Sequence, residues 1–194
     1  MTHVTIVASP TAPTPILKRD FIWPDETACA ALAAQLAAHL RPVLQTGGSG
    51  YIELHGTLGA GKTTFTRHLL RALGVQGRVK SPSYAVVEPH ELPDMLIHHF
   101  DFYRFNDPQE WEDAGFRDLF AAPGLKLAEW PDKAAGLLPT ADLQIHIQTP
   151  SSADSEQRMV SIQAFSAAGQ SALQALHALH AHDQHDQTGA PAHG

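Results

Sequence analysis

Apolar residues along the chain follow two spacings, one typical of β-strands and one typical of helices. Short runs rich in β-branched and aromatic residues predict strands, and they lie at residues 16–22, 51–55, 84–87, 95–100 and 125–130. Helical spacing between the first two runs places four residues on one helical face: Cys29, Leu32, Leu36 and Leu40. Strands that alternate with helices indicate an α/β fold with a mostly parallel core sheet.

Capping and helix-breaking residues in the first half of the chain predict where its elements end. Asp25 can cap the first helix, and Pro42 is expected to end it because proline lacks a backbone N–H. The glycines within residues 47–50 predict a flexible connection. A second helix is expected to end at Gly74, and residues 88–93, which contain two prolines, are expected to form a turn.

The second half of the chain combines one short helix, two alternating runs and a longer helix. Asp107 is expected to cap the short helix, which ends at Gly115. Residues 142–148 and 158–165 alternate polar and apolar positions, which predicts antiparallel strands appended to the sheet. A last helix is predicted from about residue 167 to residue 181.

The length of the chain, 194 residues, suits one well-buried domain and is too short for two of ordinary size. Residues 1–15, which are rich in Thr, Pro and Ala, are expected to form a flexible leader. The folded domain is expected to span residues 16–182. The His-rich residues 183–194 are expected to be a disordered tail with weak, adventitious affinity for metals.

Composition limits the classes of function. The chain has 13 Lys and Arg against 20 Asp and Glu, a net charge of −7, whereas strong nucleic-acid binding depends on cationic side chains. The single cysteine, Cys29, excludes an internal disulfide framework and a thiolate metal cluster. No signal-peptide pattern begins the chain and no apolar stretch approaches membrane-spanning length, so a cytoplasmic location is expected.

The sequence Gly-Thr-Leu-Gly-Ala-Gly-Lys-Thr-Thr at residues 56–64 fits the phosphate-binding pattern G-x-x-x-x-G-K-[ST], which begins here at Gly56. It follows a predicted strand and opens a predicted helix, as the pattern requires. Lys62 would reach the β- and γ-phosphates of a nucleoside triphosphate, and the Thr63 hydroxyl would ligate Mg²⁺. Backbone N–H groups would hold the phosphates, from Leu58, Gly59, Ala60, Gly61, Lys62, Thr63 and Thr64. The motif predicts a three-layer, P-loop NTPase-like fold.

Acidic residues follow two of the predicted strands. Asp101 and Glu129 each end an apolar run, and ligands of α/β sheets bind at the carboxyl ends of the strands. Asp101 is therefore a candidate Mg²⁺ acid, and Glu129 a candidate for orienting or deprotonating water. From position alone, each is also compatible with a surface or salt-bridged acid. Trp130 is either a core residue or a wall of the nucleotide site, and residues 81–83 form either an ordinary turn or a γ-phosphate sensor.

Four motifs occur in a fixed order and at characteristic spacing. They are residues 56–64, Val-Lys-Ser-Pro-Ser-Tyr at 79–84, His-Phe-Asp-Phe-Tyr-Arg at 99–104 and Glu-Trp-Pro at 129–131. Together they resemble the bacterial ATPase component of tRNA threonylcarbamoyladenosine biosynthesis, the TsaE family, over about residues 23–165. The resemblance implies a domain that binds ATP and Mg²⁺ and hydrolyses ATP slowly. It also implies partners, the subunits of the threonylcarbamoyl transferase heterodimer, with tRNA engaged indirectly.

The resemblance assigns roles residue by residue. The implied catalytic residues are Lys62, Asp101 and Glu129. The implied Mg²⁺ ligands are Thr63, Asp101 and Glu129. The implied switch-like loop is Ser81, Pro82 and Ser83. The implied nucleotide neighbours outside the phosphate loop are Glu26, Thr27 and Trp130, the first two near the adenine. This chain departs from the family at two positions. Thr57 stands where the family commonly has Asp, and Ser83 stands where it commonly has Thr.

Two other functions remain open for the same loop. A small-molecule kinase would use it too, but that class usually carries a long Arg-bearing lid, and the sequence has none. A regulatory ATP-binding module with little turnover is the second alternative, suggested by Thr57 in place of a carboxylate. A GTPase is disfavoured because no Asn-Lys-x-Asp motif is present.

Overall fold

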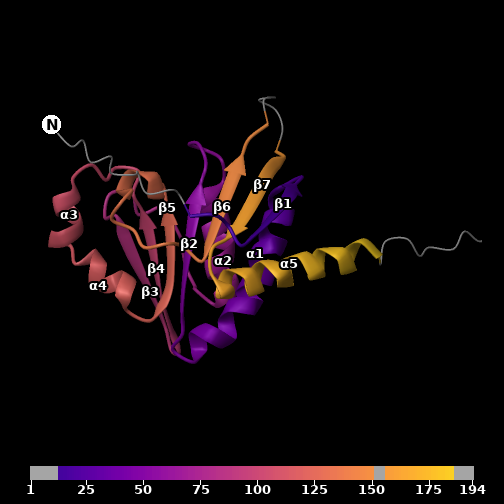
Figure 1. The fold of residues 1–194 in the computed structure, drawn as a ribbon, viewed down its shortest axis with the longest axis horizontal. Helices are drawn as coiled ribbons and strands as arrows, with labels where there is room; N and C mark the ends of the chain where they lie inside the picture. Colours follow the sequence, from indigo (N-terminus) through magenta and orange to yellow (C-terminus); the bar gives the residue numbers. More distant parts are fainter. Residues whose placement is uncertain (1–12, 151–155, 186–194) are drawn as a thin grey trace, which may run out of the picture.

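The computed structural model describes residues 13–150 and 156–185 (Figure 1). One sheet contains the strands β1 (Leu17–Trp23), β2 (Ser49–His55), β3 (Val87–Leu92), β4 (Met95–Asp101), β5 (Gly124–Glu129), β6 (Leu143–Gln148) and β7 (Arg158–Ala164). The helices are α1 (Glu26–Gln45), α2 (Lys62–Leu73), α3 (Pro108–Asp113), α4 (Phe116–Ala121) and α5 (Ala167–His185), with a 3₁₀ turn η1 (Pro131–Ala134).

The strand order across the sheet is β1-β7-β6-β2-β5-β4-β3. The central strands β6, β2, β5 and β4 run parallel to one another, while β1, β7 and β3 pair antiparallel with their neighbours. The predicted α/β fold with a mostly parallel core and appended antiparallel strands is thus confirmed. Strand β6 differs in detail from the prediction, because it pairs in parallel with β2 on its other side and so belongs to the core.

Helices cover both faces of the sheet, which gives three layers (Figure 1). On one face, apolar residues of α1, α2 and α5 pack in a single cluster with β2 residues such as Ile52 and Leu54. On the other face, α3 and α4 contribute Trp111 and Phe116 to a mainly aromatic cluster that includes Tyr51 of β2. Because successive strand residues point to opposite faces, β2 supplies both cores and lies at the centre of the molecule.

The first helix continues past Pro42, so the predicted end there is wrong. Helix α1 extends to Gln45 with Pro42 inside it, in its last turn. There the loss of one N–H is offset by capping bonds, since the Thr46 hydroxyl and the Gly48 N–H both donate to the Val43 carbonyl (2.9 Å each). Leu44 is buried in the main core, which favours the extra turn.

The predicted strand at 84–87 and turn at 88–93 are displaced in the structure. Strand β3 covers Val87–Leu92, and the chain turns directly after it into β4. Proline is tolerated at Pro89 because β3 is the edge of the sheet and pairs only with β4. Residues 84–86 form a loop instead, in which Val86 has an unusual φ of 64°.

The predicted short helix is confirmed as α3, and a second helix that was not predicted, α4, follows it directly. Asp107 caps α3 by accepting the Gln109 N–H (2.9 Å), and Gly115, with φ of 67°, separates α3 from α4. Helix α4 is six residues long, too short to show a helical period in the sequence. Strand β2 begins at Ser49, inside the predicted flexible connection.

The ends of the predicted domain are only partly described. Helix α5 extends to His185, past the predicted helix end at residue 181 and domain end at residue 182. Most of the predicted leader and tail lie outside the described residues. In the described part of the chain, no helix combines the length and the apolar character needed to cross a membrane.

Candidate functional site

The loop of residues 56–61 connects β2 to α2, the position that the phosphate-binding pattern requires. Gly56, Gly59 and Gly61 have φ of 143°, 78° and 112°, values that other residues rarely adopt. A Cβ on Gly56 would also lie 2.4 Å from the backbone oxygen of Ile147. Gly61 is the N-cap of α2 and has no side chain to bond the first N–H groups. The helix N-terminus is thus open to an anion.

Lys62 is buried and folded over its own loop. Its Nζ donates to the backbone oxygens of Gly56 (2.7 Å) and Thr57 (2.9 Å). Burial lowers the pKa of Lys62, while the charges of Glu129 and Asp101 raise it. A poorly hydrated ammonium at the start of α2 adds to the positive field of the helix N-terminus.

Trp130 lies against the Lys62 ammonium. The Nζ atom is 3.7 Å from the centre of the indole ring, within the range of a cation–π contact. Tyr103 packs on the same tryptophan with ring centres 5.0 Å apart. Trp130 has φ of 58°, which is rare for a bulky residue and is typical of functional sites rather than of ordinary core. The structure therefore places Trp130 at the wall of the candidate site.

Asp101 and Glu129 end the neighbouring parallel strands β4 and β5, where they are register partners. Both are almost fully buried, with 3% and 1% of their surfaces exposed. The Thr63 hydroxyl donates to Glu129 Oε2 at 2.8 Å, which connects the first turn of α2 to the end of β5. The structure thus brings the phosphate loop and both predicted acids together, although they are far apart in sequence.

A buried histidine holds the other oxygen of Glu129. His99 Nε2 lies 2.8 Å from Glu129 Oε1, and the His99 side chain is fully buried. A carboxylate accepts hydrogen bonds but does not donate them, so this ring nitrogen carries the proton. Both oxygens of Glu129 are therefore held by protein donors, which fixes the direction of the carboxylate.

The predicted switch-like loop contacts the other acid. The Ser81 hydroxyl donates to Asp101 Oδ2, and the Tyr103 N–H donates to Oδ1 at 2.9 Å. Ser83 lines the same pocket as Asp101, whereas Pro82 is buried and does not. Ser81 is thus bonded to the acid and Ser83 shares its pocket, and the sensing role of this loop stays a prediction.

A pocket of about 330 Å³ opens in front of these groups. The predicted residues that line it are Leu58, Gly59, Gly61, Lys62, Thr63, Thr64, Ser81, Ser83, Asp101, Glu129 and Trp130. Tyr103 and Arg104 complete its lining. Gly56 does not line it, and its part is to set the path of the loop.

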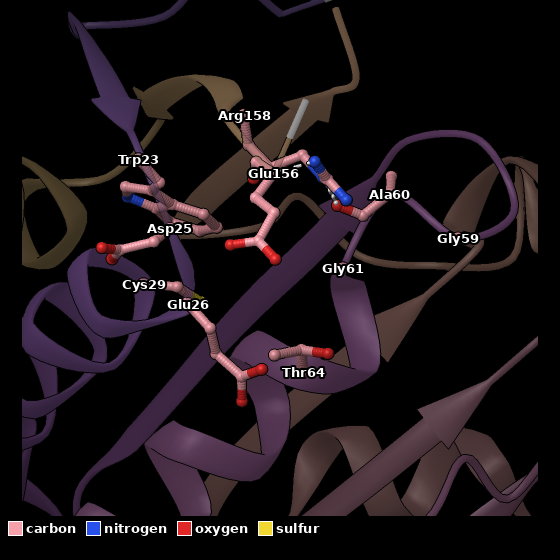
Figure 2. Close-up of a pocket in the computed structure, with 10 residues that line it drawn as sticks. All are labelled: Trp23, Asp25, Glu26, Cys29, Gly59, Ala60, Gly61, Thr64, Glu156 and Arg158. Atoms are coloured by element: carbon pink, nitrogen blue, oxygen red, sulfur yellow. Dashed lines mark hydrogen bonds between the residues drawn. The ribbon is translucent and has the colours of Figure 1, made fainter. Parts of the chain in front are cut away.

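A second pocket, of about 360 Å³, adjoins the first and shares Gly59, Gly61 and Thr64 with it. Figure 2 shows Trp23, Glu156 and Arg158 on one side of this second pocket, with Glu26 and Thr64 facing them. Ala60, predicted from the motif, lines this pocket. Of the two residues predicted near the adenine, Glu26 lines it and Thr27 does not.

Several site residues were not found from the sequence. Arg158 Nε donates to the Ala60 backbone oxygen at 3.0 Å, a contact that joins residues 98 positions apart, so no local pattern indicates it. Trp23 was assigned no role and Cys29 was placed only on the apolar face of the first helix, and both line the second pocket. His99 was the one with a usable signal, because it lies two residues before Asp101 in a quoted motif.

Comparison with known families agrees with this geometry. Residues 23–160 match the family model described as threonylcarbamoyl adenosine biosynthesis protein TsaE. The chain belongs to the TsaE family. The match includes every residue that lines the two pockets and all four sequence motifs.

Individual relatives carry the same description. A tRNA threonylcarbamoyladenosine biosynthesis protein TsaE from Haemophilus influenzae is 48% identical over half of this chain, and the match spans 61% of that protein. Its namesake from Bacillus subtilis is 35% identical over 68% of this chain and 77% of its own length. The crystal structure of Bacillus subtilis YdiB superposes with a TM-score of 0.64 over 88% of this chain and 97% of that one, at 23% identity, which establishes the shared fold.

Proposed function

We propose that this chain is a Mg²⁺-dependent ATPase that supports the threonylcarbamoyladenosine modification of tRNA. In this proposal it acts as a subunit beside the threonylcarbamoyl transferase pair, on the adenosine next to the anticodon. Membership of the TsaE family supports the pathway, and the names of the relatives point to the same modification.

The observation that carries the ATPase proposal is the meeting of three groups at one pocket. Thr63 at the start of α2 is bonded to Glu129 at the end of β5, and Glu129 is the register partner of Asp101 on β4. Phosphoryl chemistry needs a phosphate cradle, an oxygen ligand for the metal and a group that positions the nucleophile. The loop can serve as the phosphate cradle, Thr63 and Asp101 as oxygen ligands for the metal, and Glu129 as the group that positions the nucleophile.

The donor set fits Mg²⁺ held jointly with a nucleotide. Within residues 13–150 and 156–185, no three His, Cys, Asp or Glu side chains are arranged to hold a metal ion. The Thr63 hydroxyl and the carboxylates of Asp101 and Glu129 are hard oxygen donors, and Mg²⁺ is usually held by one or two carboxylates together with phosphates and water. Bound there, Mg²⁺ would neutralise charge on the β- and γ-phosphates.

The two adjoining pockets suggest how ATP would lie. The phosphates would occupy the pocket that contains Lys62, Thr63 and Asp101, next to the helix N-terminus. The nucleoside would extend past Gly59 and Thr64 into the pocket lined by Trp23 and Arg158. Glu129 would then face the terminal phosphate, where a carboxylate can orient or deprotonate the attacking water.

A protein partner accounts for the RNA pathway better than direct RNA binding. The net charge of −7 gives little of the positive field that RNA binding requires. In this proposal the transferase subunits contact the tRNA and the ATPase acts on them.

The deciding experiment reconstitutes the modification with the full chain. ATP binding and phosphate release are measured with and without the transferase pair, and tRNA modification is scored in parallel. We expect Mg²⁺-dependent ATP binding, slow hydrolysis alone, and modification over repeated cycles only when the chain is present.

Each alternative predicts a different result. Transfer of the γ-phosphate to a small acceptor instead of water would indicate a kinase. Tight ATP binding with no phosphate release, even with the partners, would indicate a regulatory module. If the pair modified tRNA equally well through many cycles without the chain, the proposed role would be lost.

A further inference from the structure

Arg104 is a second cation at the phosphate pocket, which it lines together with Lys62. Its guanidinium carbon lies 4.3 Å from the centre of the Tyr84 ring, and Nη2 donates to the Tyr84 hydroxyl at 3.3 Å. Tyr84 is 85% exposed, so this contact is open to water. Among the described residues, no carboxylate forms an ion pair with Arg104.

The Arg104–Tyr84 contact is one of two links between the same pair of segments. Ser81 donates to Asp101, and three positions further along each segment Tyr84 meets Arg104. The first link lies at the carboxylate proposed for the metal, and the second lies at the rim of the same pocket. The segment that contains Ser81 therefore also contacts Arg104, through Tyr84.

The charge of a bound triphosphate favours a change of partner for Arg104. Among the residues that line the phosphate pocket, Asp101 and Glu129 are acidic while Lys62 and Arg104 are basic. A planar guanidinium forms paired, charge-assisted hydrogen bonds with phosphate oxygens. Such bonds are stronger than an exposed cation–π contact with one long hydrogen bond to a neutral hydroxyl.

We propose that Arg104 binds the terminal phosphate of the nucleotide, and that Tyr84 holds its guanidinium beside the pocket before the nucleotide arrives. This inference rests on the proposed ATPase function and adds a residue to it. Arg104 then serves as an arginine finger supplied by the same chain.

In hydrolysis, a bond forms between the water oxygen and the terminal phosphorus while the bond from that phosphorus to the bridging oxygen breaks. The products are ADP, inorganic phosphate and the proton released from water. Arg104 stabilises the negative charge that is spread over the terminal phosphoryl oxygens during this exchange. Because ADP lacks the terminal phosphate, Arg104 should distinguish triphosphate from diphosphate.

The binding test compares the full-length protein with Arg104→Ala, Arg104→Lys and Arg78→Ala. Arg78 is an exposed arginine that lines neither pocket, so it controls for the loss of one positive charge. Affinities for ADP and for a non-hydrolysable ATP analogue are measured by calorimetry with Mg²⁺. We expect Arg104→Ala to weaken the affinity for the analogue roughly tenfold, as the loss of a charge-assisted bond implies. The affinity for ADP should stay within about twofold of the wild-type value.

Single-turnover hydrolysis supplies a second readout. We expect Arg104→Ala to lower the rate by roughly a thousandfold, the lower end of the range for arginine fingers. Arg104→Lys should restore part of the analogue affinity and little of the rate, because lysine is a point charge without the planar fork. Tyr84→Leu should bind the analogue as tightly as wild type or more tightly, since no contact to Arg104 must be broken.

The outcomes separate this inference from the proposed function. Equal weakening of ADP and the analogue in Arg104→Ala, or no change in either, would overturn the role of Arg104. Weaker analogue binding in Tyr84→Leu would mean that Tyr84 still contacts Arg104 in the bound state, and it would overturn the proposed change of partner. A wild-type protein that binds neither nucleotide would instead remove the ATPase proposal itself. Thermal denaturation of each variant verifies that it is folded.

Discussion

The Thr63 hydroxyl and Glu129 Oε2 are 2.8 Å apart, and this bond joins the first turn of α2 to the end of β5. The same carboxylate is held from its other side by His99 Nε2 at 2.8 Å. Because Glu129 is 1% exposed, neither bond is weakened much by bulk water. The groups proposed for the metal and for the nucleophilic water are thus rigidly connected to the phosphate loop.

This connection predicts that Glu129 affects turnover more than binding. In Glu129→Gln the shape and the bond from His99 can persist, and the Thr63 hydroxyl can accept from the new amide NH2 instead of donating, but the negative charge and the base are lost. We expect kcat to fall by roughly a hundredfold or more, the usual contribution of a general base, while ATP affinity changes little. Phosphate release and calorimetry with a non-hydrolysable analogue give the two quantities. Wild-type turnover in this variant would remove Glu129 from the mechanism.

His99 is predicted to position Glu129. In His99→Phe, the charged acceptor Glu129 Oε1 loses its histidine donor, and a hydrogen bond of this kind is worth about 1.5–3 kcal/mol. This corresponds to roughly a 10- to 100-fold loss of rate if the carboxylate moves. His99→Gln, whose amide nitrogen can occupy the position of Nε2, should recover most of the rate. Nucleotide affinity should stay the same in both variants.

A purely structural role of His99 would give a different pattern. Both variants would then lose thermal stability together with kcat, and the glutamine variant would show no selective recovery. Measuring the melting temperature beside kcat and KM separates the two cases.

Lys62 is predicted to be needed for triphosphate binding. Its ammonium donates to two backbone oxygens of the loop, and a bound phosphate would exchange with them. Removing two charge-assisted bonds in Lys62→Ala should weaken ATP binding by roughly a hundredfold.

Lys133→Ala is the matched control, since Lys133 is exposed and lines neither pocket. Calorimetry on both variants measures the effect of each lysine. An unchanged ATP affinity in Lys62→Ala would contradict the assignment of the phosphate loop.

Local sequence predicted those parts of the site that depend on backbone conformation. Gly56, Gly59 and Gly61 have positive φ, which favours glycine, so the phosphate loop can be recognised from its glycines in the sequence. Asp101 and Glu129 were predictable because each ends an apolar run, and parallel strands bring such ends together.

Features that depend on tertiary contacts were missed. Pro42 predicts a helix end when only the sequence is considered. In the structure, buried Leu44 and the bonds to the Val43 carbonyl extend the helix to Gln45. Likewise, Pro89 indicates a turn in an isolated segment and is compatible with a strand only at a sheet edge, which sequence periodicity does not reveal. Arg158 comes from a distant strand, so only the folded chain shows its contact with Ala60.

Cys29 provides a test of where the nucleoside lies, because it is the single cysteine and lines the second pocket. Burial, with a smaller effect of Glu26, raises its pKa to about 12. With an ordinary thiol pKa of about 8.5, the thiolate fraction at pH 8 is lower in the folded protein by roughly three orders of magnitude. Alkylation by iodoacetamide should therefore be slow in the native protein, become faster as pH rises toward 12, and be fast in denaturant.

ATP with Mg²⁺ should slow the alkylation of Cys29 further by covering the second pocket, whereas Mg²⁺ with inorganic phosphate, which can fill only the phosphate pocket, should not. Mass spectrometry of the intact chain measures the rate, and equal rates with ATP and with phosphate would place the nucleoside elsewhere.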